Sequence, residues 1–492
     1  MGIYTNEEMK KMPRRGVVYT IAPSFTDINT IWAGTDDGYI QVTHDGGKYW
    51  KNVTPPEITS WSKVSIMEAS HSDLNTAYAA VNRIRCDDMR PYIYKTRDGG
   101  KTWQKITNGL PDNEPINAVR EDPVRKGLLF AGSENAVYVS FDDGANWQSL
   151  RLNMPATSIR DLVIKDDDLV LGTHGRGFWI LDDITPLRQI NAGLASQKAI
   201  FFKPQTAIRI RWDMNTDTPL PQEEPTGQNP PEGAILDYYL SEKATGPVTL
   251  KITDPNGKLV RKYSSDDPIY PIPPSNVPDY WVRPQQLLSA DAGAHRFLWD
   301  MHFTRLEEPV SFPMQAIYNN TAPSPNSPWV MPGVYTVTLT VNGEKIAQSI
   351  AIKMDPRVKT NMADLQKQYQ LSMTCYQGIL KAREVMQDVK NAHSELQKKM
   401  TAGGANQSKL EALNKEVEKF ESVARGGKRG GGSTEISFGG LSGSFSGLLG
   451  ILQESEMPPT TQTITAVNQT EKSFSTLLSE WNQVKTKLAL LK

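Results

Sequence analysis

The chain contains Thr43-His44-Asp45-Gly46-Gly47-Lys48-Tyr49-Trp50, and the same pattern returns at Thr96-Arg97-Asp98-Gly99-Gly100-Lys101-Thr102-Trp103 and at Ser140-Phe141-Asp142-Asp143-Gly144-Ala145-Asn146-Trp147. All three copies read Ser/Thr-x-Asp-x-Gly-x-x-Trp. They begin at residues 43, 96 and 140, so they lie 53 and 44 residues apart. A repeat of about 40–50 residues with short strands is typical of β-propeller blades. The pattern therefore predicts the architecture of the first third of the chain.

Each copy is expected to form a tight turn between two strands of one blade. Asp and Ser/Thr side chains accept hydrogen bonds from nearby backbone N–H groups. The glycine two residues after the Asp can adopt a positive φ, and the Trp offers a large apolar ring that packs between neighbouring sheets. We therefore interpret as structural rather than catalytic the residues Asp45, Gly47, Trp50, Asp98, Gly100, Trp103, Asp142, Gly144 and Trp147.

The three copies resemble Asp-boxes, also called BNR repeats, which are known from sialidases, sortilin-type receptor domains and some glycoside hydrolases. The chain as a whole resembles the C-terminal portion of bacterial sortilin-like BNR-repeat proteins, which are often labelled glycosyl hydrolases. Besides the three turns, this resemblance rests on segments 31–38, 91–96, 172–183 and 229–234. It implies a propeller longer than the one this chain supplies, and an extracellular or periplasmic location.

The composition excludes several classes of protein. The 492 residues predict two to four domains, and 38% hydrophobic residues are enough for packed cores. A net charge of −1 without a basic stripe argues against a nucleic-acid partner. The two cysteines, Cys86 and Cys375, lie too far apart in sequence to suggest a disulfide framework or a thiolate metal site. We find no signal peptide and no stretch long enough to span a membrane, and we expect no cofactor.

Short apolar strands mark about four blades of a partial propeller within residues 1–185. Each follows a turn signal, and the first three precede a Ser/Thr-x-Asp-x-Gly-x-x-Trp copy. The four strands are Thr30–Gly34, Thr76–Ala80, Leu128–Gly132 and Asp168–Gly172. Because the resemblance implies a larger ring, we expect an open arc with exposed edges. A partner chain or a missing N-terminal segment would complete it.

The fold class predicted for the whole chain is mostly β, with three regions after the propeller. Residues 186–232 are expected to form a Pro-rich linker. Residues 233–355 alternate apolar and polar side chains, as in Tyr335–Val341, and predict a β-sandwich of immunoglobulin- or fibronectin-like type. Apolar residues at helical spacing within residues 356–492 predict a helical bundle, interrupted by a Gly-rich loop at 425–433.

Asp36 and Asp37 are the candidate catalytic acids. A glycoside hydrolase usually needs two carboxylates flanking the scissile bond, one protonated and one ionised. This pair follows a strand, in a turn that a propeller can present toward a central cleft. The structural alternative, which we favour, is that these two carboxylates accept hydrogen bonds from backbone amides in the turn before Gly38.

Arg83 and Arg85 are candidate binding residues. They share a loop with Arg90, near Tyr92 and Tyr94, and this set of residue types is the one that sialidase chemistry uses. The sialidase arginines come from separate blades, however, whereas these lie on one loop. Ion pairing within the loop is therefore favoured over sialidase catalysis, and the loop remains a candidate for partner contacts.

His174 and Arg176 are the second pair of binding candidates. Glycines on both sides of Arg176 allow a tight excursion that projects both side chains, which in a central channel would bind an anion or a sugar. The favoured alternative is that Arg176 pairs with an acidic neighbour. His295, Asp300 and His302 are not expected to form a metal site, because the two histidines would point to opposite faces of a regular strand.

Two functions remain open at this point. The sequence favours a non-catalytic, propeller-based binding or scaffold protein for a glycan or peptide, as part of a larger sortilin-like propeller protein. The alternative is a glycoside hydrolase with acidic residues on propeller loops. A pair of carboxylates about 5–10 Å apart across a cleft would distinguish the second function from the first.

Overall fold

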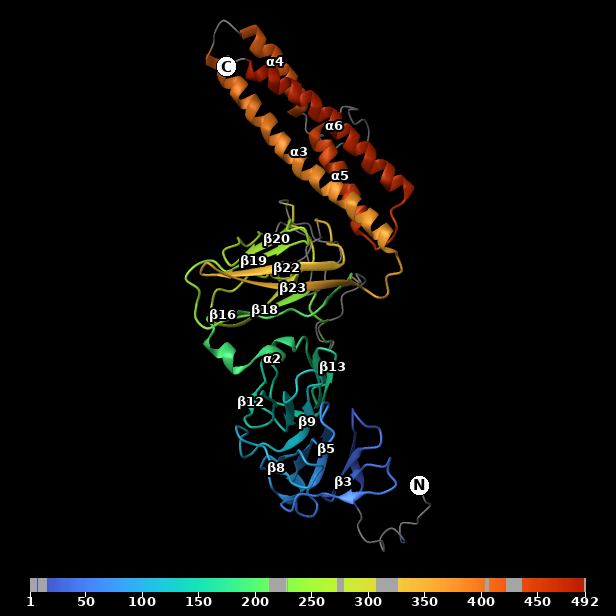
Figure 1. Ribbon diagram of the computed structural model, residues 1–492. Helices are drawn as coiled ribbons and strands as arrows, with labels where there is room; N and C mark the ends of the chain where they lie inside the picture. Colours follow the sequence, from blue (N-terminus) through green and yellow to red (C-terminus); the bar gives the residue numbers. More distant parts are fainter. Residues whose placement is uncertain are drawn as a thin grey trace. The chain divides into compact units, whose positions relative to one another are not determined.

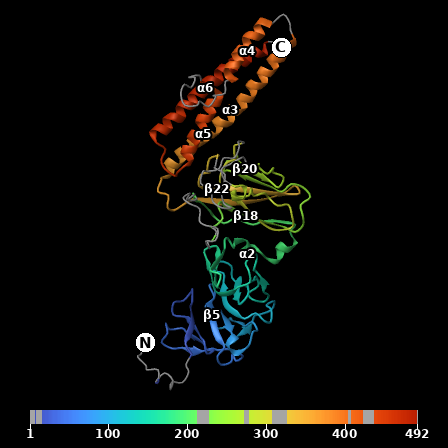
Figure 2. The same cartoon turned by 180° about the vertical axis from the view of Figure 1, so that it is seen from behind.

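The computed structural model describes Glu7 and residues 16–211, 227, 229–271, 278–306, 326–402, 407–421 and 436–490. The chain divides into two compact units, Met1–Gln197 and Lys198–Lys492, which are described separately (Figures 1 and 2). The Gly-rich loop predicted at 425–433 lies outside the described residues, as do parts of the predicted linker and sandwich.

The first unit contains four small antiparallel sheets, each built from strands that are consecutive in sequence. Sheet 1 contains β1 (Val18–Pro23), β2 (Ile31–Thr35), β3 (Ile40–Thr43) and β4 (Lys51–Asn52). Sheet 2 contains β5 (Lys63–Ala69), β6 (Ala77–Asn82), β7 (Ile93–Thr96) and β8 (Gln104–Lys105). Sheet 3 contains β9 (Ile116–Glu121), β10 (Leu129–Ser133), β11 (Val137–Ser140) and β12 (Gln148–Ser149). Sheet 4 has three strands, β13 (Ser158–Lys165), β14 (Asp168–His174) and β15 (Phe178–Leu181).

The second strand of each sheet coincides with one of the four apolar strands predicted from the sequence. The sheets pack on one another in chain order, because three separate core clusters join sheet 1 to sheet 2, sheet 2 to sheet 3 and sheet 3 to sheet 4. Trp32, Met67 and Phe130 are completely buried in these layers. Within the described part of the unit, no core cluster joins sheet 4 back to sheet 1. The sheets therefore form a series with two ends.

The region predicted as a linker, residues 186–232, contributes to both units. Helix α2 (Thr185–Gln189), which begins one residue before this region, and the 3₁₀ helix η2 (Ala192–Ser196) belong to the first unit, which also has η1 (Ile84–Cys86). Strands β16 (Ala199–Phe201) and β17 (Ala207–Arg209) instead join sheets of the second unit, because Phe201 and Ala207 supply apolar side chains to its core.

Two sheets of the second unit enclose a common hydrophobic core. The smaller sheet has the order β16, β18 (Ala234–Leu240), β21 (Gly293–Trp299). The larger has the order β17, β23 (Glu344–Met354), β22 (Gly333–Val341), β19 (Thr249–Thr253), β20 (Leu259–Ser264). Only the β17–β23 pairing is parallel among the described strands. The unit also has the 3₁₀ helix η3 (Asp279–Trp281). β19 and β20 pair as an antiparallel hairpin, whereas the immunoglobulin-like type of the sandwich stays a prediction.

The C-terminal region is helical, as predicted. It contains α3 (Met362–Ala402), α4 (Gln407–Glu421), α5 (Phe438–Gln453) and α6 (Thr461–Ala489), and α3, α5 and α6 run side by side in both views (Figures 1 and 2). Their buried stripes include Ile379, Phe445 and Trp481. Leu380, next to Ile379 in α3, is 43% exposed, because the helical phase places Ile379 on the buried face instead. Of the helices described, none is long and apolar enough to cross a membrane.

Candidate functional site

The Ser/Thr-x-Asp-x-Gly-x-x-Trp copies form turns between the third and fourth strands of sheets 1, 2 and 3. In the first turn, Asp45 Oδ1 accepts hydrogen bonds from the backbone N–H groups of Lys48 (2.9 Å) and Tyr49 (3.0 Å) and from Thr43 Oγ1 (2.8 Å). The N–H of Gly47 donates to Thr43 Oγ1 at 3.0 Å. Because these bonds favour the ionised carboxylate, the Tyr49 amide above all holds the pKa of Asp45 below its ordinary value.

Asp98 and Asp142 hold the second and third turns in the same way. Asp98 Oδ1 accepts from the N–H of Thr102 at 2.9 Å, and Asp142 Oδ1 accepts from the N–H of Asn146 at 2.8 Å. The Thr102 amide is the main reason that the pKa of Asp98 falls to about 2. A carboxylate that its own turn keeps ionised is a poor general acid near neutral pH. The turns also require positive φ angles, which are adopted by Gly47, Gly100 and Gly144.

The tryptophans of the three turns differ in what they contact. Trp103 donates its indole Nε1–H to the Val53 carbonyl at 2.7 Å, and Trp147 donates to the Ile106 carbonyl at 2.9 Å. Both acceptors directly follow the fourth strand of the preceding sheet. Trp50 instead donates to a carbonyl of its own turn at 3.2 Å and is 43% exposed. The expectation that every ring packs between sheets is therefore wrong for Trp50, because no sheet precedes sheet 1 among the described residues.

Asp36 and Asp37 lie in the turn between β2 and β3, and both are half-buried. Asp36 Oδ1 accepts from the N–H of Val17 at 2.8 Å, and Thr35 Oγ1 donates to Asp37 Oδ1 at 2.5 Å. The backbone carbonyl of Asp37 accepts from the N–H of Trp61 at 2.8 Å. Each carboxylate is therefore engaged by a donor of its own chain, in the manner of a turn acid.

The loop that carries Arg83 and Arg85 is organised around an acid of its own. Asp88 accepts hydrogen bonds from Arg90 Nε and Nη2, both at 2.9 Å, and from the Tyr92 hydroxyl at 2.8 Å. Arg83 Nη1 lies 3.5 Å from the same carboxylate. The pKa of Asp88 consequently lies well below its usual range, mainly because of Arg90. Arg83 thus pairs with an acidic residue of its own loop, whereas Arg85 is exposed.

His174 is the last residue of β14, and Arg176 lies in the loop that follows it, between β14 and β15. This loop turns through Gly175 and Gly177, whose φ angles are 93° and 66°. Trp179 Nε1 donates to the Arg176 carbonyl at 3.2 Å and fixes the backbone of the loop. Both candidate side chains are exposed, and neither pairs with a carboxylate in the part of the chain that is described. The acidic partner expected for Arg176 is therefore not found among the described residues, and the turn leaves this side chain exposed.

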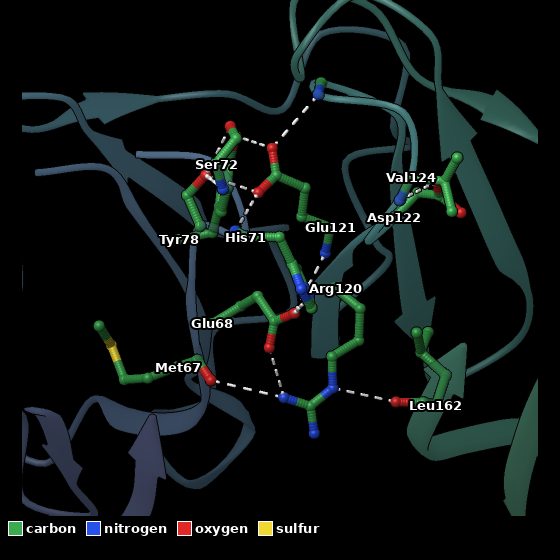
Figure 3. Close-up of polar contacts among 12 residues, drawn as sticks. Met67, Glu68, His71, Ser72, Tyr78, Arg120, Glu121, Asp122, Val124 and Leu162 are labelled. Carbon is green, nitrogen blue, oxygen red and sulfur yellow. Dashed lines mark hydrogen bonds and ion pairs between the residues drawn. The ribbon is translucent and has the colours of Figure 1, made fainter. Parts of the chain in front are cut away.

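A buried polar cluster between sheets 2 and 3 was missed by the sequence analysis (Figure 3). Glu121, at the end of β9, is only 1% exposed. Its carboxylate accepts hydrogen bonds from Ser70 Oγ at 2.7 Å, from the N–H of His71 at 2.8 Å and from the N–H of Gly127 at 3.2 Å. A buried charge needs such partners, because its desolvation is otherwise costly.

Arg120 extends this cluster across three sheets. Its Nη1 donates to Glu68 Oε2 at 2.9 Å, its Nε to the Leu162 carbonyl at 3.0 Å, and its Nη2 to Asp161 Oδ1 at 3.1 Å. The guanidinium on β9 therefore holds β5 and β13 as well (Figure 3). A planar group with donors in a fixed fork is suited to such a junction.

The cluster supplies two buried carboxylates, Glu68 and Glu121, which are 6% and 1% exposed. A glycosidase acid has to reach the substrate, and its partner needs access to a water molecule or to the sugar. Both acids here are instead covered and bound to donors of the protein. The signal available in the sequence is a charged residue inside an otherwise apolar strand. A charged side chain at such a position is almost never fully buried unless it is paired, so it indicates a polar partner.

The rejected metal site remains unsupported by the geometry. His295 Nε2 lies 2.7 Å from the Asp291 carbonyl, whereas His302 Nδ1 lies 2.8 Å from the Asp300 carbonyl. His302 is buried, which lowers its pKa to about 4. In the described ranges, no group of three His, Cys, Asp or Glu side chains is placed to hold a metal ion.

Comparisons with known proteins give weak structural likeness only. No family model matches the chain. No curated protein matches it either. A GH74 enzyme from Niastella koreensis is 15% identical, with a TM-score of 0.26, over 33% of this chain and 22% of that one. YCF48 from Cyanidioschyzon merolae is 18% identical, with a TM-score of 0.27, over 35% of this chain and 55% of that one. A structure titled YCF48 bound to D1 peptide is 14% identical, with a TM-score of 0.28, over 51% of this chain and 70% of that one.

These structural neighbours are β-propeller proteins. The matched part of this chain spans about a fifth of the length of the GH74 enzyme and about half of the YCF48 from Cyanidioschyzon merolae. Family membership does not follow from matches of this strength.

Proposed function

We propose that the first unit is a non-catalytic arc of a larger, sortilin-like Asp-box propeller that binds a peptide or a glycan. The β14–β15 loop carries this proposal. It holds His174, Arg176 and Phe178 in solvent, and Phe178 is 82% exposed. An arginine and an aromatic ring that the fold does not use are groups suited to recognising a ligand, and loops on a rigid scaffold are where such groups collect.

The hydrogen bonding and the burial of the candidate carboxylates favour binding over hydrolysis. Asp36 and Asp37 accept hydrogen bonds from Val17 and Thr35. Glu68 and Glu121 are buried in the cluster around Arg120. Glu68 and Glu121 therefore lack the accessible position that the two acids of a glycosidase need, and Asp36 and Asp37 each serve as an acceptor within their own turn.

The proposal is tested with arrays of glycans and of peptides, probed with the full chain. We expect retention on one array, weakened by at least about thirtyfold in an R176A/F178A double variant, since each of the two lost contacts costs on the order of 1–2 kcal/mol. K101A is the matched control, because Lys101 is an exposed cation in the second turn. Retention on neither array would contradict binding. Glycoside turnover that D37N abolishes would establish the hydrolase instead.

A further inference from the structure

The interface between consecutive sheets is repeated in detail. At each of two interfaces, the residue directly after the fourth strand of one sheet contacts both the Trp and the Gly of the turn in the next sheet. Val53 accepts from Trp103, and Ile106 accepts from Trp147. A Cβ added to Gly100 would lie 2.7 Å from Val53 Cβ, and one added to Gly144 would lie 2.4 Å from Ile106 Cδ1. The glycines therefore let the aliphatic residue of the preceding sheet pack directly on the turn.

The facing surfaces of the sheets are repeated as well. One row of paired residues crosses the first three strands of each sheet at equivalent positions. The rows are Met67–Ala79–Tyr94 on sheet 2, Val119–Ala131–Tyr138 on sheet 3 and Ile21–Ala33–Gln41 on sheet 1. The preceding sheet covers the rows of sheets 2 and 3, whose members are at most 7% exposed. In the row of sheet 1, Ile21 is 63% exposed.

The first turn has the same parts, but no described residue supplies a preceding sheet for it to contact. Trp50 is 43% exposed and Tyr49 is 81% exposed. A Cβ added to Gly47 would meet only atoms of Trp50, at 3.8 Å or more. The row of sheet 1, its turn glycine and its turn tryptophan together form a third copy of the interface, with one side open.

We propose that this open face, formed by Ile21, Gly47 and Trp50, binds a four-stranded antiparallel sheet of the same repeat type in a partner chain. The docking residue of the partner is an aliphatic side chain directly after its fourth strand. It packs on Gly47, and its backbone carbonyl accepts the Nε1–H of Trp50. The argument is continuity with two interfaces that this chain already forms. The inference rests on the larger propeller of the proposed function and names where its next sheet attaches.

Sheet 4 of a second copy does not meet this requirement. Its last strand in the described part is β15, the third of the sheet, so it has no residue equivalent to Val53 or Ile106. Sheet 3 does have the equivalent residue, Leu150, whose N–H bonds to the Val137 carbonyl as that of Val53 bonds to Ile40. Sheet 3 is therefore a suitable probe, once it is placed ahead of sheet 1.

The test is a chain in which residues 17–156 are duplicated in tandem, so that 1–156 is followed by 17–492. Leu150 of the first copy then precedes Val18 of the second copy by the same eight positions that separate Leu150 from Ser158. Trp50 of the second copy faces a sheet with the required carbonyl, whereas Trp50 of the first copy does not. A W50F substitution in one copy at a time makes the other copy the only reporter.

We expect oxidation of Trp50, followed by mass spectrometry, to be about tenfold slower in the second copy than in the first, because protection follows burial and local opening. I21K in the second copy should remove this protection, and I21K in the first copy should change nothing.

Equal oxidation of both copies overturns the inference, as does loss of amide protection throughout the duplicated sheets. A dimer of the unmodified chain with Trp50 protected overturns the stated partner, because a second copy then covers the face. Protection without ligand retention on the arrays would leave the docking face standing and contradict only the ligand.

Discussion

Trp147 donates its indole Nε1–H to the Ile106 carbonyl at 2.9 Å, and its side chain joins the third turn to sheet 2 with only 3% exposure. Trp50 occupies the same position of the same motif and is 43% exposed. The motif therefore forms its turn wherever it occurs, but its tryptophan stabilises the fold only where a preceding sheet offers a carbonyl and an aliphatic side chain. This difference leads to a direct comparison between the two residues.

Substitution of Trp147 by Phe should destabilise the first unit by about 2 kcal/mol, because a buried hydrogen bond is lost and the smaller ring leaves a cavity. The same substitution at Trp50 should change the free energy of unfolding by no more than about 0.5 kcal/mol, as for most exposed sites. Urea unfolding monitored through amide exchange in β9–β11 measures both. Equal effects of W147F and W50F would contradict the different roles assigned to the two rings.

Substitution of Glu121 by Gln should also destabilise the first unit, by about 3 kcal/mol, because an amide NH₂ group replaces one acceptor among donors that are already buried. Because Gln keeps one carbonyl oxygen, the donors that lose their partner are either Ser70 Oγ and the N–H of His71, which share Oε2, or the N–H of Gly127, which bonds to Oε1. D161N is the control, since the Asp161 side chain is 60% exposed and its pair with Arg120 is worth at most about 1 kcal/mol. Comparable losses in the two variants would show that burial of Glu121 is not what matters.

The repeat could be predicted from the sequence because its turn is local. Asp45 bonds to amides three and four residues away, so the motif alone contains the information. The Glu121 cluster could not be predicted, because two of its donors, Ser70 and His71, lie 51 and 50 residues away in the sequence. The exposure of Trp50 depends in the same way on a sheet outside its own. Local chemistry is therefore readable from sequence, whereas contacts between sheets are not.

The second unit contains a buried ion pair between its larger sheet and its helices. Nη2 of Arg209, the last residue of β17, lies 2.6 Å from Oε2 of Glu456 in the connection between α5 and α6, and Arg211 Nε lies 3.2 Å from Glu456 Oε1. The side chains of Arg209 and Glu456 are 4% and 8% exposed. Substitution of Glu456 by Gln should cost about 3–5 kcal/mol, because it leaves a buried guanidinium without a counter-charge.

Amide exchange in β23 and α5 measures this loss, and E416Q is the matched control. Glu416 pairs with Lys487 at 2.7 Å, but both side chains are more than a third exposed, so that pair should contribute at most about 1 kcal/mol. Unchanged exchange in E456Q would mean that the helices are held to the sheet by apolar packing alone.

Stability of the second unit should fall as the pH falls from about 6.5 to about 4, because of His302. Burial lowers its pKa from the ordinary 6.5 to about 4, and its ring lies 4.0 Å from that of Trp329. Between these two pH values the unfolded chain binds the proton and the folded chain does not, so stability present above pH 6.5 is lost progressively. The full loss is about 3 kcal/mol.

Unfolding of the wild type and of H302Q, followed from pH 7 to pH 4, should show a steeper decline of stability in the wild type. H295Q, which changes a half-buried histidine of β21, should keep the wild-type slope. If H302Q keeps that slope too, another group must be responsible for the decline.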